Sequence, residues 1–200
     1  GADSFPLMAV PFFMLAGEIM NVGGLSKRIV NLALTLVGHM RGGLGYVVIV
    51  AAVIMASLSG SAVADTAALA SLLLPMMVAA GHDRAKAGGL IASAGIIAPI
   101  IPPSIGFVIF GVAANVSITK LFLAGIVPGL LMGISIAIAW YVVAKRENIA
   151  PPRKATGAER MKALRESTWA LVLPLIVLVG QKKGVITPTE AAVVAAVYAL

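Results

Sequence analysis

Residues 42–81, GGLGYVVIVAAVIMASLSGSAVADTAALASLLLPMMVAAG, are the stretch on which the interpretation of the fold depends. Two apolar arms, residues 42–57 and 62–81, flank a polar centre of serine and glycine, and one acid, Asp65, follows that centre. A charge in such surroundings costs about 2.5–3.5 kcal/mol on insertion scales if it faces lipid. Unwound backbone that is rich in oxygen atoms can replace the water around an ion. We therefore expect this stretch to bind a cation inside a membrane.

The composition is that of an integral membrane protein. The 200 residues are 60% hydrophobic and 12% charged, with a mean hydropathy of +1.03, whereas soluble domains carry about 25% charged residues. The net charge of +7 comes from basic residues between apolar runs, which is the positive-inside pattern and predicts no nucleic-acid partner. The absence of cysteine excludes disulfides and thiolate metal sites. The chain begins and ends in apolar segments, so we expect it to be part of a longer protein.

Charged residues stand at both ends of the stretch 42–81. Arg41 precedes it, and Arg84 and Lys86 follow it, so both ends should lie on one side of the membrane. A pair of full crossings and a re-entrant hairpin both satisfy this topology. The centre contains no charged or aromatic residue of the kind that marks a membrane interface, which favours the hairpin, but the charges at the two ends do not decide between them.

Two predicted helices precede this stretch. Residues 5–22 form an apolar run broken by Pro6 and Pro11, which predicts a membrane helix that is kinked or starts late. Residues 25–40 have an apolar face and a polar stripe with a spacing of four residues, formed by Lys27, Asn31, Thr35 and His39. We expect an amphipathic helix that lies in the membrane interface.

Prolines interrupt the predicted span at residues 87–118. Pro99, Pro102 and Pro103 occur within five residues, and each lacks the N–H group of a helical hydrogen bond. The carbonyl groups four residues earlier should therefore lack their usual partners; they belong to Gly95, Ala98 and Pro99. Such backbone is tolerated at membrane depth only where protein or a polar cavity satisfies it. The alternative is an ordinary proline kink that neighbouring helices accommodate.

Residues 121–143 form the clearest predicted crossing, with 23 residues and no charge. The segment 144–166 that follows is basic, because residues 144–165 contain seven Lys or Arg against two Glu. The positive-inside rule makes this segment a cytoplasmic linker. Counting back across two crossings places Arg84 and Arg41 on the same side.

A further predicted span and a helix start follow the linker. Residues 167–181 are apolar enough for a short span. Thr187 as the N-cap, Pro188 as the first helical residue and Glu190 as the third match a capping box. A new helix should therefore begin there.

Six motifs occur in order along nearly the whole chain: PFFMLAGEIM (11–20), GHMRGGLG (38–45), SGSAVADTAAL (59–69), IIPPS (100–104), LFLAGIVPGLL (121–131) and TPTEAAVVAAVYAL (187–200). Together they resemble the large membrane subunit of tripartite ATP-independent periplasmic (TRAP) transporters. The resemblance implies an all-α integral membrane protein, with two inverted repeats that each contain a re-entrant hairpin and a broken helix. Residues 1–143 would form the first repeat, residues 144–166 the linker, and residues 167–200 the start of the second repeat.

The resemblance also implies a function. We expect sodium-driven uptake of small organic acids, such as C4-dicarboxylates, sialic acid or other sugar acids, by an elevator motion in the inner membrane of a bacterial cell. The expected partners are a periplasmic substrate-binding protein, a small membrane subunit and membrane lipid. Sodium would be the coupling ion, and we expect no other cofactor and no enzymatic activity.

The motifs carry site residues over to this chain. One sodium ion would lie between the hairpin tip and the break in the facing helix, with Asp65 either capping the amides of its helix or taking part in the ion network. The expected residues are, at the tip, Ser59, Gly60 and Ser61, and, at the break, Pro102, Pro103 and Ser104.

Two other classes of function remain open at this point. A passive channel, or a scaffold without transport, would work without a binding protein, although the chain has no repeated ring of pore-lining charges. An intramembrane serine hydrolase would use the Ser-Gly-Ser centre and would need a base within about 3 Å of the hydroxyl. The two histidines, His39 and His82, lie at the charged ends of segments instead.

Overall fold

A computed structural model describes residues 5–147, 149 and 151–199. Within that part every regular element is a helix, which confirms the all-α prediction. Residues 1–4 and 200, at the outer ends of the two predicted repeats, and residues 148 and 150, in the predicted linker, lie outside the described residues. The elements are η1 (Phe5–Met8), α1 (Ala9–Val22), α2 (Leu25–Val37), α3 (Gly43–Ser59), α4 (Ala62–Ala79), α5 (Arg84–Gly95), α6 (Ile105–Ala113), α7 (Ile118–Glu147), α8 (Gly157–Lys182) and α9 (Pro188–Ala199).

Several helices are suited to a membrane. By length and composition, three helices of the described part could each cross a bilayer, namely α4, α7 and α8. Helices α1 and α2 meet at an angle of 69° and together would pass the same test as one broken span. The polar stripe of α2 is exposed at Lys27 and Asn31, and its other face packs on α3 and α8. These contacts fit both a broken span and an interfacial helix, so the prediction that α2 lies in the membrane interface stays a prediction.

Local signals explain where the helices start. Pro11 lies in the first turn of α1, where a missing N–H breaks no helical bond, and a 3₁₀ turn precedes it. The predicted late start is therefore confirmed. At α9 the backbone N–H of Thr187 donates to Glu190 Oε2 at 2.7 Å, and the N–H of Glu190 donates to Thr187 Oγ1 at 3.3 Å. This is the predicted capping box.

The second half of the predicted linker is helical. Helix α8 begins at Gly157, ten residues before the predicted span at 167–181, and α7 extends to Glu147. A second capping box, formed by Thr156 and Glu159, starts α8. The sequence spacing Thr-x-x-Glu was available as a signal for this start. Of the described residues of the predicted linker, only 149 and 151–156 lie outside the two helices.

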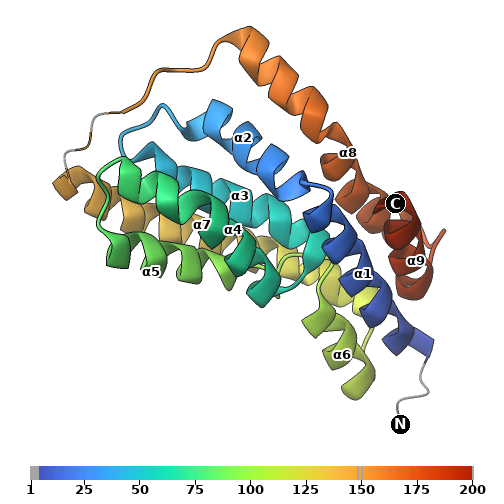
Figure 1. Cartoon of the computed structure of the whole chain (residues 1–200). Coiled ribbons are helices and arrows are strands. Elements are labelled where there is room, and N and C mark those ends of the chain that lie inside the picture. Colours follow the sequence, from blue (N-terminus) through green and yellow to red (C-terminus); the bar gives the residue numbers. More distant parts are fainter. Residues whose placement is uncertain (1–4, 148, 150, 200) are drawn as a thin grey trace.

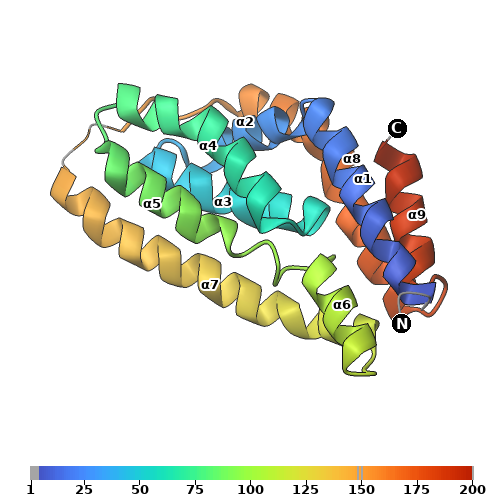
Figure 2. The same ribbon diagram turned by 60° about the horizontal axis from the view of Figure 1, so that its bottom comes forward.

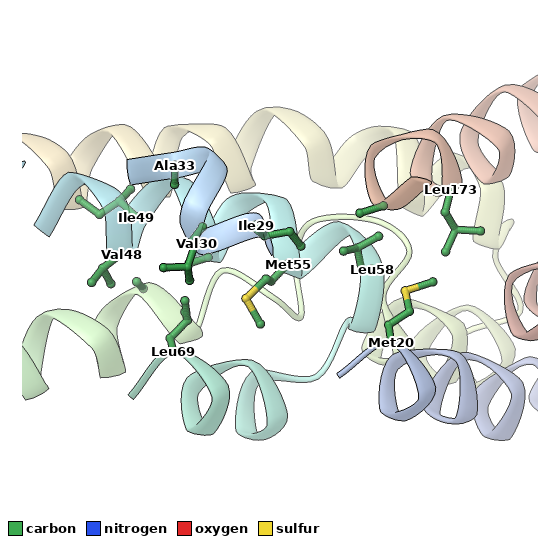
Figure 3. Packing of buried hydrophobic residues seen from close by; sticks show 14 of the residues in the cluster. Met20, Ile29, Val30, Ala33, Val48, Ile49, Met55, Leu58, Leu69 and Leu173 are labelled. Carbon is green, nitrogen blue, oxygen red and sulfur yellow. The ribbon is translucent and has the colours of Figure 1, made fainter. Parts of the chain in front are cut away.

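Helix α3 lies at the centre of the helices. It contacts α1, α2, α4, α5, α7 and α8, and Figures 1 and 2 show it enclosed between α2 on one side and α4 and α5 on the other. Its side chains pack in nearly every direction, as expected for a helix that is apolar all round. In Figure 3, Val48 and Met55 of α3 meet Val30 of α2 and Leu69 of α4.

Polar contacts tie the base of the hairpin to the end of α7. Trp140 Nε1 donates a hydrogen bond to the carbonyl of Gly42 at 2.8 Å. His82 Nδ1 donates to Glu147 Oε2 at 2.6 Å, and Lys86 Nζ lies 3.3 Å from Glu147 Oε1. The start of α3, the start of α5 and the end of α7 therefore lie at one end of the molecule. This arrangement agrees with the predicted placement of both hairpin ends and the basic linker on one side of the membrane.

The two tryptophans provide a test of this base. Trp140 is 3% exposed and Trp169 is 70% exposed. Trp140→Ala should lower the free energy of unfolding by about 3–5 kcal/mol, because it removes a buried ring together with one of the hydrogen bonds to the Gly42 carbonyl. Trp169→Ala, which loses a partner ring in Tyr198, should cost about 1 kcal/mol. Unfolding of the purified protein in detergent measures both, and equal losses would contradict the proposed role of Trp140.

Candidate functional site

The hairpin tip, residues 59–61, is a two-residue reversal between two helices. Gly60 has the left-handed φ of 61° that ends α3, and its N–H bonds to the carbonyl of Ala56 at 3.3 Å. Ser61 then caps α4, with its Oγ accepting from the N–H of Ala64 at 3.4 Å. Helices α3 and α4 correspond to the two predicted arms, but α3 continues through Ser57 and Ser59, so only Gly60 and Ser61 of the predicted centre are non-helical.

The tip lies directly against the break in the facing helix. A Cβ atom placed on Gly60 would lie 2.6 Å from the carbonyl oxygen of Pro103 and 3.1 Å from Cα of Ser104. Such distances leave room for glycine alone. The structure therefore brings together the two groups of residues that the motifs selected, although their role in binding sodium stays a prediction.

The break spans residues 96–104, between α5 and α6, and contains a cis peptide bond from Pro102 to Pro103. Ser104 caps α6: its Oγ accepts from the N–H of Phe107 at 3.3 Å and donates to the carbonyl of Pro99 at 2.5 Å. A hydroxyl has one donor and two acceptor positions, so Ser104 keeps one lone pair for a further ligand. This side chain is fully buried.

The carbonyl groups at the break lack their usual helical partners, as predicted, but two of them have other donors. The carbonyl of Gly95 accepts from the N–H of Ala98 at 3.2 Å, and that of Pro99 accepts from Ser104. The chain tightens into a turn after Gly95, and a side chain replaces the missing N–H at Pro99. The carbonyl of Ala98 accepts no hydrogen bond from any described residue.

The re-entrant hairpin stays a prediction, because α4 is long and apolar enough to cross a bilayer. Helices α3 and α4 have 17 and 18 residues, or about 26 Å each at 1.5 Å per residue. Helix α7 has 30 residues, or about 45 Å. Figure 2 shows α6 and the first part of α7 extending beyond the tip. The hairpin thus turns back where α5 is broken, while α6 and α7 continue.

Asp65 binds the tip rather than the amides of its helix. Its Oδ1 accepts from the hydroxyl of Ser59 at 2.5 Å, and Ser59 Oγ in turn accepts from the N–H of Ser61 at 3.1 Å. Ser61 is the residue that caps α4, so the capping role considered for Asp65 was wrong and the network role is the observed one. Asp65 is 1% exposed, and its Oδ2 has no hydrogen-bond partner in the described part. An unpaired buried carboxylate oxygen is costly unless a further donor or a cation satisfies it.

A small cavity lies beside Asp65, on the side of the tip away from the break. Its volume is about 10 Å³, close to the space that one water molecule needs. The junction of α1 and α2 closes it with Asn21 and Ser26, whose hydroxyl donates to the Asn21 side-chain oxygen. Gly17 permits this approach, because a Cβ there would lie 3.1 Å from Cβ of Ser59. The sequence analysis missed Gly17, Asn21 and Ser26; the available signal was the cluster GEIMNVGGLS at residues 17–26.

The donors around the tip are oxygen atoms. They come from the hydroxyls of Ser59 and Ser104 and from the carboxylate of Asp65. Among the described residues, no three His, Cys, Asp or Glu side chains lie close enough together to hold a metal ion. Hydroxyl, carbonyl and carboxylate oxygens suit a hard cation. The donor set therefore fits a sodium-like ion better than a transition metal.

Comparison with known proteins adds independent information. Residues 1–200 match the family described as tripartite ATP-independent periplasmic transporter, DctM component. The 2,3-diketo-L-gulonate TRAP transporter large permease protein YiaN of Escherichia coli is 60% identical over 200 residues, covering all of this chain and 47% of its own. In Vibrio cholerae, the sialic acid protein SiaM is 44% identical over 200 residues, again 100% and 47% of the two chains. The C4-dicarboxylate protein DctM of that organism is 43% identical over 197 residues, or 98% and 44%. The chain spans about half the length of these curated relatives.

Two glycines with left-handed backbone test the contact between tip and break. Gly81→Ala should cost about 1–2 kcal/mol from its positive φ alone, because a Cβ there meets no atom within 4 Å. Gly60→Ala should cost about 1–3 kcal/mol more, since its Cβ also overlaps the Pro103 carbonyl. Denaturant unfolding in detergent measures the difference. If the two variants lose the same stability, the tip does not rest on the break.

Proposed function

The chain belongs to the DctM family of TRAP transporters, and we propose that it serves as the large permease subunit of a sodium-coupled uptake system for small organic acids. The relatives above are named for 2,3-diketo-L-gulonate, sialic acid and C4-dicarboxylates, all of which are small carboxylic acids. A periplasmic binding protein would deliver the acid, and a small membrane subunit would support the permease in the inner membrane of a bacterium.

One observation carries the sodium proposal: the buried carboxylate of Asp65 has one oxygen bound to Ser59 and one oxygen without a partner in the described part. A cation near the tip would satisfy that oxygen and offset the energy of a buried charge. The residues that would hold it are Ser59, Ser61, Ser104 and Asp65. Ser104 Oγ has a lone pair for a further ligand, and Ser59 and Ser61 flank the glycine that contacts the break, which supports their assignment as ligands.

The packing supports a coupling role for such an ion. The tip touches the break on one side and the junction of α1 and α2 on the other. An ion held at the tip would therefore stabilise one arrangement of the tip, the break and the junction of α1 and α2. We propose that it orders the tip for binding of the organic acid, and that the hairpin, tied at its base to α5 and α7, moves as one body against α1 and α9 in an elevator motion.

A serine hydrolase has one observation in its favour, which is the 2.5 Å contact between the Ser59 hydroxyl and the Asp65 carboxylate. A carboxylate is a weak base for a serine hydroxyl, and the usual histidine base is not at hand. His82 is bound to Glu147 at the far end of the hairpin. Covalent labelling of Ser59 by a serine-reactive fluorophosphonate would overturn the transport proposal in favour of a hydrolase.

The sodium site is tested with paired serine variants in the complete complex, reconstituted in liposomes. Ser59→Ala with Ser61→Ala should raise the sodium concentration for half-maximal uptake about tenfold or more, because two oxygen ligands are lost. The matched control is Ser71→Ala with Ser135→Ala, two exposed serines whose hydroxyls only bond to carbonyls of their own helices. Unchanged sodium stimulation in the tip variant would contradict the site. Uptake that persists without the binding protein would point to a passive channel instead.

A further inference from the structure

A groove runs between α5 and α7, away from the hairpin tip. Its volume is about 260 Å³, and Figure 2 shows the two helices side by side along it. One face of α5 lines it with Lys86, Leu90 and Ser93, and one face of α7 adds Ile136 and Val143 among others. The spacings of three, four and seven residues show that each helix presents a single face.

The groove is apolar except at one end. Ser93 Oγ already donates to the carbonyl of Gly89 at 2.8 Å, and Trp140 Nε1 already donates to that of Gly42 at 2.8 Å. Lys86 is therefore the one lining side chain with donors to spare: an ammonium has three, and one points to Glu147 at 3.3 Å. Its side chain is 53% exposed. A sugar acid or dicarboxylate, which needs several donors, does not fit these walls.

The end of the groove at Lys86 is positively charged. The contact of His82 with Glu147 joins the start of α5 to the end of α7. Four cationic side chains lie in those two helix ends, while their two carboxylates are already engaged: Asp83 caps α5 and Glu147 binds His82 and Lys86. Of the cations, Lys86 lines the groove, Lys145 and Arg146 lie in the last turn of α7, and Arg84 lines a separate pocket beside α4. An occupant with an anionic head at Lys86 and an apolar tail complements this distribution.

We propose that the groove binds an anionic phospholipid, with its phosphate at Lys86 and an acyl chain between α5 and α7. This end of the molecule carries the basic segments that mark the cytoplasmic side, and basic pockets between membrane helices on that side bind anionic head groups. The bound lipid packs between two helices that are tied at their ends by Glu147 and so braces the base of the hairpin. The proposal does not depend on sodium coupling or on the organic acid.

The experiment uses the purified full-length protein in nanodiscs that contain phosphatidylglycerol and phosphatidylcholine. Lys86→Gln should lose about one retained phosphatidylglycerol per chain in native mass spectrometry, since the head group loses its cation. Ala139→Leu, which fills the groove without a change of charge, should lose the same lipid. Lys86→Arg should retain it. The control Lys154→Gln, in the exposed segment before α8, should leave retention unchanged.

Equal retention in Lys86→Gln and Lys154→Gln would overturn the proposal. A photoreactive phenylalanine at position 139 identifies the occupant directly: an adduct with phospholipid supports the proposal. An adduct only with protein, whether another segment of the chain, a second copy or the small subunit, would overturn it. Competition by glycerol phosphate without an acyl chain distinguishes a free phosphate site from a lipid site, and full displacement by it would also count against the proposal. Sodium-stimulated uptake, measured in parallel, tests the transport function separately.

Discussion

The close approach of Gly60 to Pro103 and Ser104 is the contact on which the candidate site depends. A glycine reverses the chain with a positive φ and leaves no side chain between two backbones. The same contact places the turn of the hairpin where α5 is broken. The hairpin tip and the break between α5 and α6 are both irregular backbone, and each would be costly alone in an apolar environment. Their contact brings the polar groups of the two segments close together.

The buried carboxylate of Asp65 needs hydrogen-bond partners or a cation at the hairpin tip. A carboxylate that is almost completely buried needs partners for both oxygens, and here the Ser59 hydroxyl serves one of them. Ser59 is itself held by the N–H of Ser61, so the network is local to the turn. The other oxygen of Asp65 has no partner among the described residues, and Asp65 lines a cavity of about 10 Å³ together with Asn21 and Ser26. A buried carboxylate beside a space of this size is chemically suited to one small cation or one water molecule.

The hairpin differs between its two ends. At the base, a buried tryptophan and a buried His82–Glu147 pair link helices across long sequence distances. At the tip, contacts are made by small residues, and they surround polar groups with lone pairs to spare. A body that is firmly tied at its base and adjustable at its tip suits a transporter, in which an ion alters the tip while the helices around it move together. An anionic lipid in the groove between α5 and α7 would strengthen the base without touching the tip.

Signals that act over a few residues could be found in the sequence alone. They include the membrane class, the two hairpin arms, the proline break and the helix start at Thr187, because apolar runs, missing N–H groups and capping side chains work locally. The family followed from the order of the motifs. The start of α8 is also set by a local signal, the capping box of Thr156 and Glu159, which the sequence-based prediction did not use. Only the tertiary structure decided the donors for the Gly95 and Pro99 carbonyls, the partner of Asp65 and the approach of Gly17 to Ser59. The approach of Gly17 to Ser59 arises from the packing of α1 against the hairpin, which no spacing along the chain specifies. The other contacts join residues three to six positions apart, but several donors and acceptors lie within that reach, and only the observed backbone path selects among them.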